Sequence, residues 1–467
     1  MNGAAPVESA GASLRGGSLS FAETIGQSIA NIAPTLTPAL NISVVVALAG
    51  PGAWLSYLIA TVGLIFVAAN ISVLARRHAF AGSYFVYIGR TLGPAAGMLA
   101  GWSMIAAYLF TAIAVSICAH IFLSDMLIAL GLAALIPSYG LFEIAFLLLV
   151  WAFAYRDIRL SSRVGLVLEA SSLTIIVLIA AIVVSKHGSV IDSAQLGLKH
   201  LPIGGVMSAL TFAVFSFVGF ESAATLAREA RNPMRTIPRA VTLSAAFGGL
   251  FFVLIAYAMM LGVNDHAGLI GGSASPFAAV TRRAGVTWAA AIVYFSATIS
   301  GFACGLASIN ALARMLFSMG RYHFVHRAMG TVHQRHQTPA FAVTIACLLT
   351  LIVVLMFSHT PPLDAFGYTA AFGTFGFLFV YLLSCVAAPV ELARAGKLSA
   401  GGLVTGVLGT GLMAFVIVGS LVPVPAYPYA ILPYLFLAYL VLGGAWYAIV
   451  SVRTPDAVTR IELDLEG

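Results

Sequence analysis

Long apolar segments separated by short polar connections fill most of the chain. An α-helix of about 20 predominantly apolar residues crosses the hydrocarbon core of a bilayer. No connection is long enough to hold a soluble domain, so we predict an all-α integral membrane protein with a single transmembrane domain over residues 20–452. The pattern predicts twelve membrane-spanning helices, at residues 20–48, 52–75, 95–127, 139–155, 162–185, 204–229, 237–262, 286–319, 339–358, 364–389, 401–422 and 428–452.

The composition supports the same class of protein. Of the 467 residues, 61% are hydrophobic and 8% are charged, whereas about 25% of residues are charged in average usage. The four cysteines lie in apolar runs and form no CxxC pair, so we expect neither a disulfide framework nor a metal site, and no cofactor. Residues 1–19 are predicted to be a disordered cytoplasmic tail, and residues 453–467 a second cytoplasmic tail.

The positive charges predict the orientation of the chain. If both termini are cytoplasmic, all but four of the 23 Lys and Arg residues fall in inner segments. Such a bias is typical of the positive-inside rule and favours a multi-pass protein of the cell membrane with both termini inside. The charges form short loop clusters without interleaved aromatic residues, which argues against nucleic-acid binding. The four outer residues are Lys186, Lys199, Arg282 and Arg283.

The sixth predicted span contains residues that are unusual in a membrane helix. Gly219 lies in mid-span, where glycine costs about 1 kcal/mol relative to alanine. Glu221 follows, and a charge at membrane depth costs roughly 2.5–3.5 kcal/mol on insertion scales. Together they indicate a broken helix whose backbone faces a solute-filled cavity. The alternative is a continuous helix in which the glycine packs against a neighbour; the Asn232-Pro233 and Ile237-Pro238 pairs that follow favour the break.

The first span is interrupted in a similar way. Its sequence, FAETIGQSIANIAPTLTPA at residues 21–39, contains Pro34 and Pro38, each of which removes a backbone hydrogen bond. Gln27 and Asn31 lie one turn apart on one helix face. Spans one and six begin two possible five-helix repeats, and interrupted segments at matching positions of two halves point to a transporter binding site. A proline-kinked structural helix is the alternative.

Four motifs occur in the chain in a recognisable order: AGSYFVYIGRTLGPAAGMLAGW at residues 81–102, FSFVGFES at 215–222, EARNPMRTIPRA at 229–240 and NALARMLFSMGR at 310–321. In this combination the chain resembles the amino acid–polyamine–organocation (APC) permease superfamily. The resemblance implies a leucine-transporter-type fold with inverted five-helix repeats at residues 20–185 and 204–389. Two accessory helices over 401–452 would follow them.

The same resemblance implies that substrate binds between the unwound centres of helices one and six. A helix-three aromatic residue, here Tyr108, is a candidate for closing the cavity, although a packed role is the alternative. Phe215 lies at the break and is the candidate lid. The helix-one break departs from the G-S-G type of many members, because this chain has Gly26-Gln27-Ser28 followed by IANIAP. The predicted substrate-binding residues are Gln27, Ser28, Ala30, Asn31, Ile32, Ala33, Tyr108, Phe215, Ser216, Phe217, Val218 and Gly219.

The expected activity is secondary active transport by alternating access. The positive start of one half-helix and the carbonyl end of another suit a zwitterion such as a free amino acid. A polyamine or organic-cation carrier and an amino acid exchanger are the alternatives. The chain has no HExxH motif or nucleophile elbow, so an enzyme is not expected. The oligomeric state and the amino acid carried stay open.

Three residues are candidates for coupling or gating: Glu221, Ser296 and Ser300. Glu221 either carries a proton or holds the unwound segment in shape, and we favour the structural role. Ser296 and Ser300 share a helix face and can place hydroxyls on a cation, or they bond to neighbouring backbone. Glu169 is interpreted as a carboxylate near the interface, paired with Arg163. Both H+ and Na+ stay open as the coupling ion.

Overall fold

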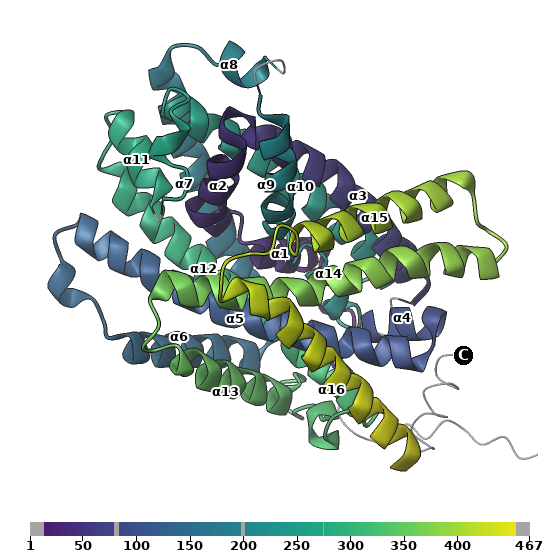
Figure 1. Ribbon diagram of the computed structural model, residues 1–467. Coiled ribbons are helices and arrows are strands. Elements are labelled where there is room, and N and C mark those ends of the chain that lie inside the picture. The colour runs from purple at the N-terminus through teal and green to yellow at the C-terminus, as the bar shows by residue number, and fades with distance from the viewer. Residues whose placement is uncertain (1–13, 79–83, 198–200, 274, 454–467) are drawn as a thin grey trace, which may run out of the picture.

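The computed structural model describes residues 14–78, 84–197, 201–273 and 275–453 (Figure 1). Within these residues the chain is helical, without a strand; one isolated parallel bridge joins Leu19 to Ala230. The α-helices are α1 (Phe21–Ile32), α2 (Leu36–Ala49), α3 (Ala53–His78), α4 (Tyr84–Leu92), α5 (Pro94–Ala129), α6 (Tyr139–Arg156), α7 (Ile158–His187), α8 (Ser193–Leu196), α9 (Ile203–Phe215), α10 (Pro233–Gly262), α11 (Pro276–Arg283), α12 (Ala289–Arg321), α13 (Ala340–Met356), α14 (Pro362–Arg394), α15 (Ala400–Gly419) and α16 (Leu432–Arg453).

By length and composition, nine helices of the described part can cross a membrane. One of these, Leu36–His78, joins α2 and α3, and two shorter apolar helices are α9 and α13. An all-helical membrane protein is therefore confirmed, whereas the arrangement of twelve helices in two inverted repeats remains a prediction. Figure 1 shows α8 and α11 together at one end of the bundle and the turn between α14 and α15 at the opposite end.

The centre of the bundle is built on α5, α10 and α12, whose side chains are mostly buried. α12 packs against α5 and α7, α10 packs against α3, and α14 packs against α5. Small residues allow this close approach: a Cβ atom added at Gly376 of α14 would lie 2.8 Å from the backbone oxygen of Ser103 in α5. The exposed leucine and valine side chains of α15 and α16 lie at the periphery, where a lipid-facing surface is expected.

Helix one is broken. α1 begins with a capping box, in which Ser20 and Glu23 satisfy each other's backbone N–H groups. It ends at Ile32, because Ala33 adopts a left-handed conformation with φ of 48° and Pro34 follows. The chain becomes helical again at Leu36 as α2. The interruption falls at Pro34, whereas Pro38 lies in the first turn of α2.

Helix six is also broken, as the sequence favours, and the alternative of a continuous helix is wrong. α9 ends at Phe215, and the chain continues through turns into a 3-10 helix, η4 (Ser222–Leu226), instead of staying α-helical to residue 229. Gly219 has a φ of +99°, a backbone angle that residues with a side chain rarely adopt. A Cβ atom there would also lie 2.7 Å from Nδ2 and 2.8 Å from the backbone oxygen of Asn31. The glycine therefore allows the two breaks to touch.

A short segment before α1 ties several elements together. The backbone N–H of Leu19 donates to the Glu229 carbonyl, and the Arg231 N–H donates to the Leu19 carbonyl, each at 2.9 Å. Arg159 of α7 donates to the Ser18 carbonyl at 2.8 Å. Residues 14–19 of the predicted tail thus contact the rest of the protein, whereas residues 1–13 and the tail 454–467 lie outside the described residues. Residues 79–83, which include the start of the 81–102 motif, lie outside them too.

Candidate substrate site

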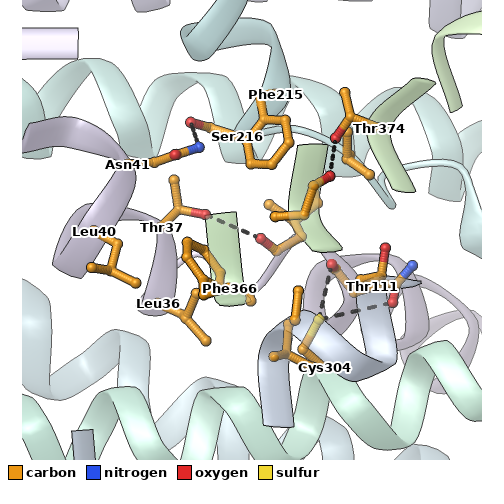
Figure 2. Close-up of a pocket in the computed structure, with 17 residues that line it drawn as sticks. Leu36, Thr37, Leu40, Asn41, Thr111, Phe215, Ser216, Cys304, Phe366 and Thr374 are labelled. Atoms are coloured by element: carbon orange, nitrogen blue, oxygen red, sulfur yellow. Dashed lines mark hydrogen bonds between the residues drawn. The ribbon is translucent and has the colours of Figure 1, made fainter. Parts of the chain in front are cut away.

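The two helix breaks border a cavity of about 70 Å³ (Figure 2). A single water needs about 10–15 Å³ of such cavity space, so this cavity is large enough for roughly five waters. Side chains from helices one and six, α5, α12 and α14 line it. The lining residues are Asn31, Ile32, Ala33, Leu36, Thr37, Leu40, Asn41, Thr111, Ala114, Val115, Phe215, Ser216, Val218, Cys304, Phe366, Ala370 and Thr374.

No lining residue carries a formal charge. The polar groups are amides, hydroxyls and one thiol, and the rest of the wall is apolar. Figure 2 shows the rings of Phe215 and Phe366 among these residues. A few polar groups in a mostly apolar wall are typical of a site that orients a small molecule.

Asn31 carries the most informative polar group of the cavity. Its side-chain oxygen accepts a hydrogen bond from Ser308 at 2.6 Å, which fixes the amide. Its Nδ2 is buried and makes no hydrogen bond within the described residues. Buried donors are nearly always paired, so an unpaired one needs an explanation. Because Asn31 lines the cavity and touches Gly219, its free amide group offers a donor where the two breaks meet.

The end of α9 is held by a second polar cluster. Ser216 accepts a hydrogen bond from Asn41 Nδ2 at 3.1 Å, and its hydroxyl lies 3.0 Å from the Tyr57 hydroxyl. Figure 2 shows the bond between Asn41 and Ser216 at the edge of the cavity. These contacts connect α2, α3 and the break in helix six.

Glu221 lies behind the cavity and does not line it. The carboxylate is fully buried and accepts hydrogen bonds from the Tyr108 hydroxyl at 2.9 Å and from the Tyr381 hydroxyl. Tyr84 donates to the backbone oxygen of Glu221 at 3.3 Å, and the Gly219 N–H reaches the Tyr381 hydroxyl at 3.5 Å. Tyr108 is therefore part of the support of the unwound segment and is not among the residues that line the cavity.

The structure brings together half of the predicted substrate-binding residues. The six that line the cavity are Asn31, Ile32, Ala33, Phe215, Ser216 and Val218. The six that do not are Gln27, Ser28, Ala30, Tyr108, Phe217 and Gly219. A role in binding stays a prediction for the first group.

The second group supports the breaks from outside the cavity. The Gln27 amide donates to the Ala307 carbonyl of α12 at 2.8 Å. The Ser28 hydroxyl accepts from the backbone N–H of Ala223 at 2.9 Å, which links helix one to η4. Phe217 packs edge-on against an aromatic ring of α10, with the ring centres 5.2 Å apart. These residues position the two interrupted helices.

Glu169 is not paired with Arg163, so that interpretation is wrong. Arg163 donates to Glu23 of α1 at 2.7 Å. Six residues correspond to about 1.7 helical turns, so Arg163 and Glu169 point to different sides of α7. Glu169 is 1% exposed and accepts hydrogen bonds from Ser300 of α12 at 3.1 Å and from Ser172 at 3.4 Å.

Ser296 and Ser300 both face α7. The Ser300 hydroxyl bonds to Glu169, and the Ser296 hydroxyl donates to the backbone oxygen of Ser172 at 3.0 Å. The Ser172 hydroxyl lies 2.9 Å from that of Thr35 at the start of α2. A buried polar chain therefore connects the break in helix one with α7 and α12. One carboxylate oxygen of Glu169 has no hydrogen-bond partner in the described structure.

Two buried charges were missed by the sequence analysis. Arg314 of α12 donates from Nε at 2.6 Å and from Nη2 at 2.7 Å to the two carboxylate oxygens of Glu229. Glu229 is 0% exposed and Arg314 only 3%. Both residues occur in the motifs given above, but the sequence around each of them suggests only a charged residue at the end of a helix. Nothing in that sequence indicates that the two pair across 85 positions.

Broken helices that meet at an uncharged cavity inside a bundle of membrane-length helices define a solute transporter. The groups that line the cavity do not form a catalytic site, since they are only amide, hydroxyl, thiol and apolar groups.

Comparison with known proteins identifies the family. The family model described as amino acid permease matches residues 24–459, so the chain belongs to the amino acid permease family. The resemblance to the APC superfamily is thereby confirmed. The family and its members compared below are transporters, and the chain is accordingly not an enzyme.

Three relatives cover much of the chain. It is 26% identical over 362 residues to a branched-chain amino acid permease of Bacillus subtilis, covering 73% of this chain and 74% of the relative. It is 26% identical over 306 residues to a low-affinity putrescine importer of Escherichia coli, covering 64% and 66%. A glutamate/serine transporter of Bacillus subtilis is 25% identical over 329 residues, covering 66% and 60%. The relatives thus differ in their substrates.

Proposed function

We propose that this permease is a secondary active transporter of zwitterionic amino acids in the cell membrane and works by alternating access. The observation that carries the proposal is the buried, unpaired Nδ2 of Asn31, a residue that lines a cavity without charged side chains and is held by Ser308 beside Gly219. An amide donor with no partner calls for an acceptor on the ligand, and a carboxylate is such an acceptor.

The broken helices provide the second half of the recognition. α2 begins at the cavity with Leu36 and Thr37, where the N-terminal end of a helix favours an anion. α9 ends at the cavity with Phe215, and carbonyl groups at helix ends attract an ammonium group. We propose that the substrate carboxylate lies between Asn31 and the start of α2. The amino group then lies toward the carbonyl end of α9.

A polyamine carrier is less well supported by the same cavity. A diamine has no carboxylate for Asn31 and carries a second ammonium group, which requires an acidic partner. Neither Glu221, which is bonded to Tyr108 and Tyr381, nor Glu169 lines the cavity. Desolvation of an unpaired ammonium group in this apolar space would be strongly unfavourable.

We further propose that coupling depends on Glu169. Its carboxylate links α7 to Ser300 and, through Ser172, to the break in helix one. Protonation or cation binding there would alter contacts within one turn of the substrate site. Replacement by glutamine should keep substrate binding but remove the dependence of uptake on the ion gradient.

The test is uptake by the purified protein in proteoliposomes, with radiolabelled neutral amino acids and, separately, putrescine. Asn31→Asp exchanges the amide donor for a carboxylate of the same size and should lower amino acid uptake at least about tenfold, as a loss of 1.4 kcal/mol would. The matched control Asn264→Asp makes the same change at an exposed loop position and should transport normally.

Uptake of putrescine but of no amino acid by the unmodified protein would refute the proposed substrate class. Normal amino acid uptake by Asn31→Asp would remove Asn31 from recognition. Loading the vesicles with unlabelled amino acid separates net uptake from exchange, because an exchanger takes up label only when the vesicles are loaded.

A further inference from the structure

A further buried carboxylate, besides Glu221, Glu169 and Glu229, lies in α6, away from the substrate cavity. Glu143 is the fifth residue of that helix and is fully buried. Figure 1 shows α6 below α5 and beside α13, and it also packs against α7 and α12. Four residues at about 1.5 Å each place Glu143 about 6 Å from the start of the helix, at the end predicted to face outward. Glu143 is not among the residues that line the substrate cavity.

Neither oxygen of the Glu143 carboxyl accepts a hydrogen bond within the described residues. The polar group beside it is the Ser116 hydroxyl of α5. That hydroxyl donates its proton to the Ile113 carbonyl at 2.9 Å, and it can turn toward Glu143 only by giving up that bond. A buried carboxylate anion with no donor and no cation is strongly unfavourable. The neutral acid is favourable, because its O–H group donates to the free lone pair of the Ser116 oxygen.

His120 lies one turn from Ser116 on the same face of α5. Its ring packs against Tyr139, with ring centres 5.5 Å apart, and against Phe142, at 5.1 Å. Its Nε2 lies 3.2 Å from the Pro137 carbonyl in the turn before α6, while its buried Nδ1 has no partner. A histidine in this position connects the carboxyl region with the turn at the outer end of the helix.

The other helices packed against α6 offer no basic partner at the level of this site. Arginine and lysine of α7 and α12 lie toward the ends of those helices, and α13 carries none. The titratable residues that face the region or lie on its packed helices within the membrane are Tyr108, Cys118, His120 and Asp125 of α5, Tyr139 and Tyr155 of α6, Glu169 of α7, Tyr294 and Cys304 of α12, and Cys347 of α13.

We propose that Glu143 is a proton-binding site, separate from the substrate site, which is occupied at neutral pH and reached from the outer end of the helix past His120. Keeping this proton lowers the stability of the folded protein progressively as the pH rises above the ordinary titration of glutamic acid, until the site loses it and an uncompensated charge remains between α5 and α6.

The test compares the thermal stability of the full-length protein with that of Glu143→Gln between pH 7 and pH 10. Glutamine has the size of the neutral acid but cannot ionise. Glu143→Gln should already be the more stable protein at pH 7, because the unfolded chain releases the proton of an ordinary glutamic acid near pH 4 whereas the folded protein keeps it. From pH 7 up to the titration of the site, the unfolding equilibrium constant of the unmodified protein should rise relative to that of Glu143→Gln by about tenfold per pH unit. Above that titration the ratio should stay constant, as linkage to a single proton requires. This range lies above the ordinary titration of histidine.

Two controls separate Glu143 from other groups. Burial and the neighbouring Asp192 raise the pKa of Asp265, in a loop outside the membrane spans, to about 7. Asp265→Asn should therefore change the pH dependence near neutrality but keep the alkaline loss of stability. Replacing Na+ by choline should leave the difference between the unmodified protein and Glu143→Gln unchanged.

Three results would overturn the proposal. A large loss of stability in Glu143→Gln at pH 7 would mean that the anion is required. A difference that stays constant from pH 7 to pH 10 would mean that the folded protein does not hold this proton at neutral pH. Stabilisation of the unmodified protein, but not of Glu143→Gln, by Na+ would identify a metal cation as the occupant.

Discussion

At the scale of single residues, Glu221 shows what a local pattern reveals and what it hides. A carboxylate beside a mid-span glycine predicts an interrupted helix, and the structure has one at that place. The tyrosine partners were not predictable, since Tyr108 and Tyr381 are 113 and 160 positions away and resemble the many other aromatic residues of the chain. Only the fold brings their hydroxyls to the carboxylate.

The contacts of Glu221 support the structural role over a proton-carrying one. Glu221→Gln keeps the size of the side chain and can hydrogen bond to both tyrosines, so we expect it to retain measurable uptake with an unchanged pH profile. Glu221→Ala leaves two buried hydroxyls unpaired, at about 1–3 kcal/mol each, and should lose transport. Uptake at several external pH values checks both. A flattened pH profile in Glu221→Gln would instead assign a proton to this residue.

Gly219 permits the contact between the two breaks, and a single methyl group tests this. Gly219→Ala places a Cβ atom 2.7–2.9 Å from three atoms of Asn31 and needs an unfavourable positive φ. We expect uptake to fall at least about tenfold, the effect of 1.4 kcal/mol. Gly411→Ala in α15 is the control, because no atom lies within 4 Å of its added Cβ. Normal uptake by Gly219→Ala would show that close approach of the breaks is not required.

At the scale of helices, the apolar runs predicted most of the elements but not their bounds. Pro34 and Gly219 indicated the two interruptions, whereas the predicted sixth span ran to residue 229 and α9 stops at Phe215. Hydropathy continues through an unwound segment, because that segment is as buried as a helix. The partner of Glu169 was predicted wrongly for a related reason. Its partner Ser300 belongs to another helix, whereas proximity along the sequence favoured Arg163.

The buried pair of Glu229 and Arg314 joins the end of helix six to α12. Glu229→Gln leaves a buried guanidinium without its counter-charge, which costs about 3–5 kcal/mol in comparable pairs. We expect a marked fall in the melting temperature of the purified protein, partly restored by the double variant Glu229→Gln/Arg314→Gln. Arg15→Gln removes an exposed pair with Asp157 and should change stability by about 1 kcal/mol or less. Equal effects of the two single variants would contradict this account.

At the scale of the whole molecule, composition and charge predicted the class of protein, and the motifs predicted its family. The cavity was only partly predictable. Asn31, Ile32 and Phe215 belong to the interrupted segments, but Thr111, Cys304 and Phe366 come from α5, α12 and α14 and have no local signature. A site assembled from distant helices is a property of their packing, which the hydropathy pattern does not encode.

The orientation of the molecule in the membrane is the last prediction. The asymmetry of Lys and Arg places both termini and the loop around Gln334 in the cytoplasm, and the loop around Val190 outside. The four native cysteines are buried, so they should give little background with a thiol reagent that does not cross membranes.

Val190 is 65% exposed, and Gln334 is also exposed. In intact cells we therefore expect the reagent to label Val190→Cys and not Gln334→Cys; after permeabilisation it should label both. The permeabilised sample is the control, because it shows that each introduced thiol is reactive. Labelling of Gln334→Cys alone in intact cells would require the opposite orientation, with the α12–α13 connection outside. In that case the positive charges of this chain would lie on the side of the membrane where they are normally rare.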